Sequence, residues 1–516
     1  MNRHLLMLSA LMMLLPGPAG AVGPADFGYG SAQLPDHRAV LVIIADYATA
    51  PVATNVAGSP EEWQQFLFGA DPALSMRNYM LENSNGLFSL NPARTLPVRV
   101  AMMAADSQAG ILAANPGWNS GQVDVEYFGR VVKKAIDIPG FPFAIFDTNH
   151  NGVLECPGEL TLVLINGFND GTNAAGNFPF TQQQNGGQTF TVAGSVLGVG
   201  HKCTFATIAH EFGHSLGIPW ELYTGGSPNG LVNEGMTIMS QTNFGSQGVE
   251  IVNDPSKYNP GRLHFDPWSK LRFGWTRPRI VEIRTGGRFD IPIATSKKVD
   301  APIILYDPAK GFHEYFILEY RARSGDPTQY DANFAQASLG GTTAGLVIWQ
   351  VATQNDHSSF PNNWAPTDPL LSSLLVPTVG LPAYSSSILC RCPPALGVFA
   401  NEPWGSGTTT PVLRWFDGAS TATRLRVLPL AAGADRITVE ILAEYDTWVD
   451  FSSLGIPFVP ELGTVDFPYN TFFEGKENVS YGGHLWIKPG HSAETVLNLS
   501  KPMTIHAAGN PVTIGQ

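Results

Sequence analysis

The sequence predicts an α/β (α+β) domain, followed by a β-rich sandwich-like domain and a small β-helix-like C-terminal module. The chain has 516 residues, which is too many for one hydrophobic core, so two or three domains are expected. Apolar runs of strand length alternate with segments of helical periodicity as far as about residue 280. From there on, short strand-like runs are separated by turn-rich stretches.

The α/β domain is expected to cover residues 22–280. The run over residues 40–45 is apolar and β-branched, and it predicts a buried strand. Pro60 begins a predicted helix, because an early proline followed by acidic residues is typical of a helix N-terminus. The other elements predicted here are helices over residues 75–85, 124–137 and 206–216, the last ended by Gly217, and a strand over residues 160–165.

The β-rich domain is expected over residues 281–445, where runs such as 314–320 and 345–351 have strand character. Residues 446–516 form the predicted C-terminal module. Its short strands are broken by glycine and proline, and they resemble a rung of a right-handed parallel β-helix. One rung cannot bury its own faces, so we expect this module to pack against the preceding domain.

Residues 1–21 have the pattern of a signal peptide. A short positive start is followed by an apolar run over residues 5–15 and by the small residues Ala19 and Ala21, which are typical of a cleavage site. The apolar run is shorter than the ~20 residues that span a bilayer. The sequence therefore predicts a secreted (extracellular) protein with no membrane span after signal removal.

Composition and charge exclude some classes of partner. Hydrophobic residues make up 44% and charged residues 14%, which indicates a globular chain. The net charge of -13 provides no basic surface for nucleic acid, so no nucleic-acid partner is expected. An even number of cysteines in an exported chain predicts two disulfides, with three pairings of Cys156, Cys203, Cys390 and Cys392 left open.

The predicted helix over residues 206–216 carries the motif His210-Glu211-Phe212-Gly213-His214. Histidines four residues apart share a helical face, so both imidazoles can reach one metal ion. Glu211 lies beside the first of them, where its carboxylate can take a proton from a zinc-bound water. This arrangement predicts a catalytic zinc site with His210 and His214 as ligands and Glu211 as general base. The alternative is a surface helix with a histidine pair.

The residues that follow this helix sharpen the prediction. Gly217 comes three residues after His214, as in metzincins, where glycine lets the chain turn towards the metal. Residues 236–240 (Met-Thr-Ile-Met-Ser) resemble the Met-turn, the methionine-bearing loop that lies under the metal of metzincins. The alternative for Met239 is an ordinary buried methionine. The α/β domain is therefore predicted to be metzincin-like.

Segments outside the zinc motif carry a wider resemblance. Residues 39–46, 77–86, 265–275, 314–321 and 345–351 are similar to corresponding segments of the secreted metallopeptidases of the immune inhibitor A family. The likeness covers most of residues 38–352. It implies a zinc metalloprotease, a hydrolase that cuts peptide bonds within protein or peptide substrates. It also implies that His210, Glu211 and His214 are first ligand, general base and second ligand.

The sequence departs from the metzincin pattern at the third ligand. Position 220 is tryptophan, which cannot bind zinc. Glu221 is adjacent, and we place it ahead of the rival Glu234 because the helix, the glycine and the turn already direct that segment at the metal. The departure keeps a second function open, that of a catalytically inactive secreted adhesin or binding protein that retains the metallopeptidase fold.

A second metal site is suggested by residues 147–155. Oxygen ligands at alternate positions and a glycine at the sixth match the first half of a calcium loop. The candidate ligands for Ca²⁺ are Asp147, Asn149, Asn151, Val153 and Glu155. Glu159 comes one residue later than the usual last ligand, and a polar turn held by Asx-type hydrogen bonds is the alternative.

Two further histidines, His201 and His264, lie near the motif in the sequence. A lone histidine is more often structural, so neither is included in the predicted site. Tyr223 and Tyr258 could orient a substrate or stabilise the oxyanion, but packed tyrosines are more common, so they too are left out of the predicted site. The sequence leaves the oligomeric state and the cleavage specificity open.

Overall fold

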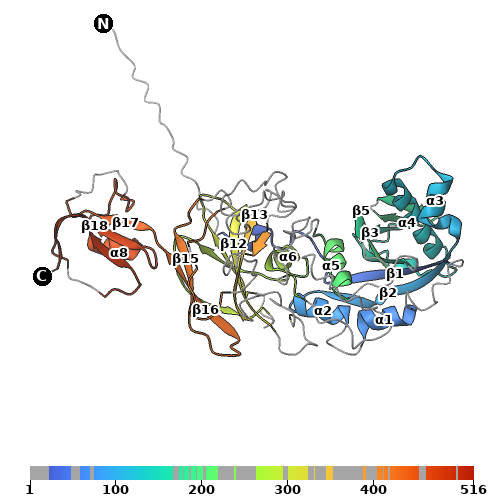
Figure 1. Ribbon diagram of the computed structural model, residues 1–516, viewed down its shortest axis with the longest axis horizontal. Coiled ribbons are helices and arrows are strands. Elements are labelled where there is room, and N and C mark those ends of the chain that lie inside the picture. The colour runs from blue at the N-terminus through green and yellow to red at the C-terminus, as the bar shows by residue number, and fades with distance from the viewer. Residues whose placement is uncertain are drawn as a thin grey trace, which may run out of the picture.

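The structure of the chain is a computed structural model that shows three parts following one another along the long axis of the molecule (Figure 1). It describes residues 22–47, 59–69, 75–166, 174–177, 179–184, 187–192, 195–200, 205–218, 237–239, 263–294, 300–323, 331, 344–352, 388–390, 404–410, 412–415, 419–452, 461–494 and 498–515. The predicted signal peptide over residues 1–21 lies outside this set.

A five-stranded sheet organises the first part, in the order β2-β1-β4-β8-β5. Its strands are β1 (His37–Tyr47), β2 (Ser89–Met102), β4 (Leu160–Asn166), β5 (Ala174–Asn177) and β8 (Ser195–Gly200). The strands β2, β1, β4 and β8 run parallel to one another, whereas β5 runs antiparallel to β8. Alternate residues of β1 enter two different hydrophobic clusters. The apolar runs predicted over residues 40–45 and 160–165 are therefore strands covered on both faces.

Helices cover both faces of this sheet (Figure 1). On one side lie α1 (Pro60–Phe68), α2 (Met76–Asn83) and α5 (Phe205–Ser215), and on the other lie α3 (Gln108–Ala114) and α4 (Ser120–Ile136). The four predicted helices are confirmed, but α4 begins four residues earlier than expected. The reason is Asn119, whose side chain accepts the N–H of Gln122 in a capping box.

Smaller elements complete this part of the chain. The strands β3 (Val153–Cys156), β7 (Thr189–Val192) and β6 (Phe180–Gln183) form a three-stranded sheet in that order. Short 3-10 helices are η1 (Pro24–Phe27), η2 (Ala104–Asp106) and η3 (Phe143–Ile145), and α6 (Pro267–Arg272) follows later in the chain. Cys156 is a buried thiol, and burial raises the pKa of this group to about 11.

The described residues of the β-rich part form two sheets. One has the order β14-β13-β12-β11-β9 and the other β10-β16-β15. Their strands are β9 (Arg279–Glu282), β10 (Gly287–Pro292), β11 (Ile303–Tyr306), β12 (Glu314–Ala322), β13 (Ala344–Ala352), β14 (Ile388–Cys390), β15 (Thr423–Val427) and β16 (Arg436–Ala443). Apolar side chains from both sheets share one cluster, as expected for sheets packed face to face.

The larger of these two sheets also faces the first part. Ile317 of β12 and Trp349 of β13 belong to the same buried cluster as Phe212 of α5 and Trp268 of α6. One hydrophobic core therefore crosses the boundary predicted between residues 280 and 281. Whether the two parts fold independently at that boundary stays a prediction. In the structure, this shared core packs the helix of the zinc motif against the β-rich part.

Parallel strand pairs form the C-terminal module. The strand β18 (His484–Ile487) pairs with β17 (Asp446–Val449) and β20 (Thr504–Ala507), and β19 (Gly490–Ser492) pairs with β21 (Val512–Ile514). The helix α8 (Phe472–Asn478) packs beside β17. The Tyr481 hydroxyl donates to Glu440 Oε1 of β16 at 3.2 Å, so the module contacts the β-rich part as expected.

The mixed α and β content predicted from the sequence is confirmed. None of the helices in the described ranges has the length and hydropathy that a membrane-spanning helix requires.

Candidate metal centre

The helix α5 carries the predicted zinc motif. The described side chains of α5 are buried, and Phe205, Ile208, Ala209 and Phe212 belong to the hydrophobic core. The helix packs against β8 and β5. It ends as predicted, because Gly217 has a φ of 109° and its N–H donates to the carbonyl of His214 at 3.0 Å. This turn places the carbonyl of Ile218 beside the ring of His214.

The two histidine rings converge. The Nε2 atoms of His210 and His214 lie 3.1 Å apart, and both residues are buried, with exposed fractions of 0% and 9%. His210 Nδ1 is 2.8 Å from the carbonyl oxygen of Ile238, and His214 Nδ1 is 2.8 Å from that of Ile218.

These contacts fix the tautomers of both rings. A carbonyl oxygen can only accept a hydrogen bond, so each Nδ1 carries the proton and each neutral ring presents its lone pair at Nε2. Two lone pairs at 3.1 Å repel each other unless they share a cation. That cation is either a metal ion or a proton, and the proton would leave a buried imidazolium.

The pair fits a zinc ion. Two nitrogens that each lie about 2.0–2.1 Å from a tetrahedral zinc are about 3.3 Å apart. The Nε2–Nε2 distance of 3.1 Å is close to this value. Metal-binding histidines also commonly donate their second ring N–H to a backbone carbonyl, which Ile218 and Ile238 supply here. Glu211 follows His210 directly and is 3% exposed, so its carboxylate belongs to the same buried region.

The methionine segment lies against this helix. Met239 is fully buried, and a Cβ added to Gly213 would lie 2.5 Å from Met239 Sδ and 2.8 Å from Phe265 Cε1. Glycine is therefore required at position 213 for Met239 to approach the helix between the two histidines. Glycine inside a helix destabilises the helix, so its presence can indicate that another group approaches closely. Gly213 was such an indication in the sequence, and the sequence analysis did not use it.

Two glutamates are the predicted candidates for the third ligand. Glu221, its rival Glu234 and Trp220 lie outside the described residues, as do His201, Tyr223 and Tyr258. Among the residues that the structure does describe, no group of three His, Cys, Asp or Glu side chains forms a metal site. The choice between Glu221 and Glu234 stays a prediction.

The side chains of the predicted calcium loop do meet. The carboxylate of Asp147 accepts the N–H groups of Asn151 and Gly152 at 3.2 and 3.0 Å. The amides of Asn149 and Asn151 donate to the carboxylate of Glu155 at 3.2 and 2.9 Å. The N–H of Val153 donates to Asn151 Oδ1 at 2.7 Å. These contacts are those of a polar Asx-type turn, one of the two alternatives left open by the sequence.

Glu159 reaches back over this loop. Its Oε1 accepts the N–H groups of Thr148 and Asn149 at 2.6 and 3.1 Å. Burial opposes ionisation of Glu159, but the hydrogen bonds from Thr148 and Asn149 lower its pKa. Glu159, which lies one residue beyond the usual position of the last calcium ligand, therefore has an ionised carboxylate close to the start of the loop.

No protein-family model matches this chain, and no curated protein matches it either.

Proposed function

We propose that this chain is a secreted zinc-dependent endopeptidase of the immune inhibitor A type, with a metzincin-like α/β domain. The observation that carries the proposal is the convergence of two buried Nε2 lone pairs at 3.1 Å, each ring being held by a backbone carbonyl. His210 and His214 would hold the zinc together with Glu221 or Glu234.

When bound, zinc would polarise the peptide carbonyl and lower the pKa of a water molecule. Glu211 would accept the proton of the attacking water and pass it to the departing amine, since it lies beside His210 in a buried region. The Ile218 and Ile238 carbonyls would keep both rings in the tautomer that binds metal.

A further observation that supports the proposal is the edge of the sheet beside α5, where an extended peptide substrate could bind. The strand β5 is the last strand of the described sheet, runs antiparallel to β8 and contacts α5. An extended peptide can add to such an edge by main-chain hydrogen bonds. A substrate bound there would pass close to the histidine helix.

The alternative function is that of a secreted binding protein that keeps the fold without catalysis, and Trp220 is the reason to consider it. The two functions separate in a hydrolysis assay. We expect the purified chain to cut a heat-denatured protein, to lose this activity with a zinc chelator and to regain it when zinc is added back. Zinc bound without any hydrolysis would favour the binding protein.

We further propose that residues 147–155 bind Ca²⁺ once the Asn149 and Asn151 amides turn their oxygens inward. Since a ligand of the native state stabilises it by mass action, Tm should rise with calcium between micromolar and millimolar concentrations. Asp147→Asn should remove this rise, whereas Asp466→Asn, at an exposed site in the C-terminal module, should keep it. A Tm that does not change with calcium would leave the polar turn as the role of these residues.

A further inference from the structure

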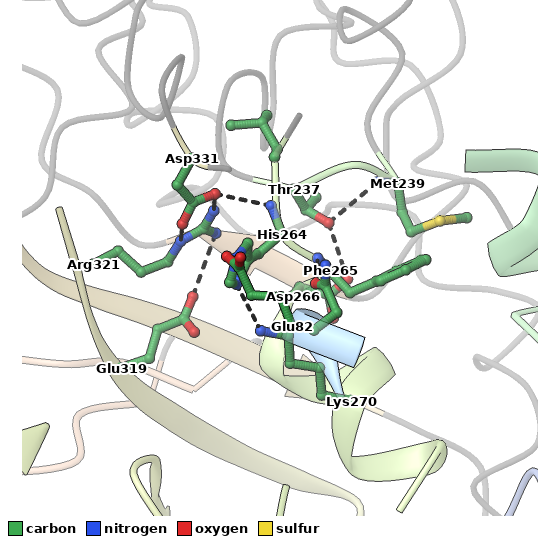
Figure 2. A network of polar contacts seen from close by, with 12 residues as sticks. Glu82, Thr237, Met239, His264, Phe265, Asp266, Lys270, Glu319, Arg321 and Asp331 are labelled. Carbon is green, nitrogen blue, oxygen red and sulfur yellow. Dashed lines mark hydrogen bonds and ion pairs between the residues drawn. The ribbon is translucent and has the colours of Figure 1, made fainter. Parts of the chain in front are cut away.

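We infer that Thr237 is a positioning residue for the metal ligand His210, acting with Asp266 and His264 to hold the Ile238 carbonyl on His210 Nδ1. This inference rests on the proposed zinc site and deepens it. Figure 2 shows these side chains meeting beneath residues 237–239.

The first step is the link between Ile238 and the metal ligand. Its carbonyl lies 2.8 Å from His210 Nδ1, and its N–H donates to the carbonyl of His264 at 3.1 Å. The tautomer of His210, and with it the lone pair at Nε2, therefore depends on how firmly residues 237–239 are held.

The second step is the hydroxyl of Thr237. It accepts the N–H of Met239 at 3.2 Å and donates to Asp266 Oδ2 at 3.1 Å. Asp266 is fully buried and is the N-cap of α6, where it also accepts the N–H and the hydroxyl of Ser269, each at 2.8 Å. The Thr237 hydroxyl thus links the residues on both sides of Ile238 to the N-terminus of α6.

The third step is the ring of His264. Lys270 Nζ, whose pKa is lowered by burial, lies 3.1 Å from His264 Nδ1, while the other ring nitrogen, Nε2, faces a carboxylate, which accepts and so places the ring proton on Nε2. That Nε2 lies 2.7 Å from Glu82 Oε1 and donates to it. The backbone N–H of His264 donates to Asp331 Oδ1 at 2.8 Å. His264, which the sequence suggested was merely structural, is therefore fixed at its ring and at its backbone.

The fourth step ties His264 to the β-rich part (Figure 2). Arg321 Nε of β12 donates to Asp331 Oδ2 at 2.9 Å, and Arg321 Nη1 lies 3.6 Å from Glu319 Oε1. Burial would raise the pKa of Asp331, but Arg321 holds it at about 2. The carboxylate is therefore ionised and the buried ion pair is complete. Trp349 Nε1 of β13 donates to Glu319 at 3.0 Å and closes the network.

Stability alone does not account for so many buried ionisable groups. Apolar side chains of similar volume commonly stabilise a core as well as a buried ion pair does, or better. What this network provides beyond packing is a fixed place for the 237–239 backbone, and therefore for the carbonyl that selects the tautomer of His210.

The test compares Thr237→Val with Thr237→Ser. Valine keeps the shape but removes the hydroxyl, whereas serine keeps it. Thr421→Val is the matched control, because Thr421 is also buried, donates to a carbonyl at 2.8 Å and accepts the N–H two residues later at 3.1 Å. Thr237→Ala replaces the valine variant if that variant does not fold.

Zinc affinity is measured by competition with a coloured chelator. We expect Thr237→Val to bind zinc about 10–100-fold more weakly, the usual effect of losing an outer contact of a ligand, and Thr237→Ser and Thr421→Val to bind it normally. Equal affinity of Thr237→Val and Thr421→Val would overturn the positioning role while leaving the zinc site intact.

A second readout needs no metal. In the zinc-free chain at about pH 9, above the ordinary histidine pKa, imidazole ¹⁵N shifts report the tautomer, and His210→Gln assigns the signal. We expect an Nδ1-protonated His210 in the unmodified chain and in Thr237→Ser, and a mixture in Thr237→Val. The same tautomer in all three would overturn the inference, whereas failure to bind zinc in the unmodified chain would overturn the proposed function.

Discussion

Replacing Glu211 with glutamine is expected to lower hydrolysis of a denatured protein by at least about 100-fold while zinc stays bound, the scale of losing a general base. Glutamine has nearly the same shape, but its amide cannot take the proton of the attacking water. Glu211 is 3% exposed and follows His210 on α5, so no bulk solvent replaces it. The rate should therefore fall through kcat, with little change in KM.

The matched control is Glu440→Gln. Glu440 is also buried, but it lies on β16 and is bonded to Arg426 and Tyr481, in the β-rich part. Its replacement should leave hydrolysis near normal. Near-normal hydrolysis by Glu211→Gln, measured at the same zinc content, would contradict the assignment of Glu211 as base.

Replacing Glu221 with alanine is expected to weaken zinc binding far more than replacing Glu234. Two histidines leave zinc with too few protein ligands, because catalytic sites normally supply three and keep one position for water. An acidic third ligand is chemically suitable, as in His₂Glu sites. The Gly217 turn carries the chain back towards His214 through Ile218, which favours the residues directly after it.

Zinc content after dialysis measures both variants side by side. The opposite ranking would make Glu234 the ligand and keep the enzyme. If neither variant loses zinc, the predicted third ligand is wrong at both positions and the peptidase assignment fails with it.

The sequence predicted the elements of the site whose position follows from local spacing. The histidines lie on one helix because they are four residues apart, and the helix ends at Gly217 because glycine tolerates a positive φ. The strands over residues 40–45 and 160–165 were found for a similar reason, since residues buried on both faces form a continuous apolar run.

The sequence did not reveal contacts made by the backbone or by residues far apart in the chain. The Ile238 carbonyl contacts His210, which is 28 residues away in the sequence. Every residue has a backbone carbonyl, so the residue type at position 238 could not predict this contact. The role proposed for His264 depends on Glu82 and Asp331, which are distant in sequence and are brought together by packing. The hydrophobic core that crosses residue 280 could not be predicted either. The sequences of β12 and β13 do not indicate whether these strands pack against one hydrophobic cluster or against two.

The zinc content of the unmodified chain after dialysis tests the proposed metal centre most directly. The converging Nε2 atoms of His210 and His214 predict about one zinc per chain, and His214→Gln should lose it. If the pair instead shares a proton, the unmodified chain will retain no zinc, and that result would contradict the proposed metal centre.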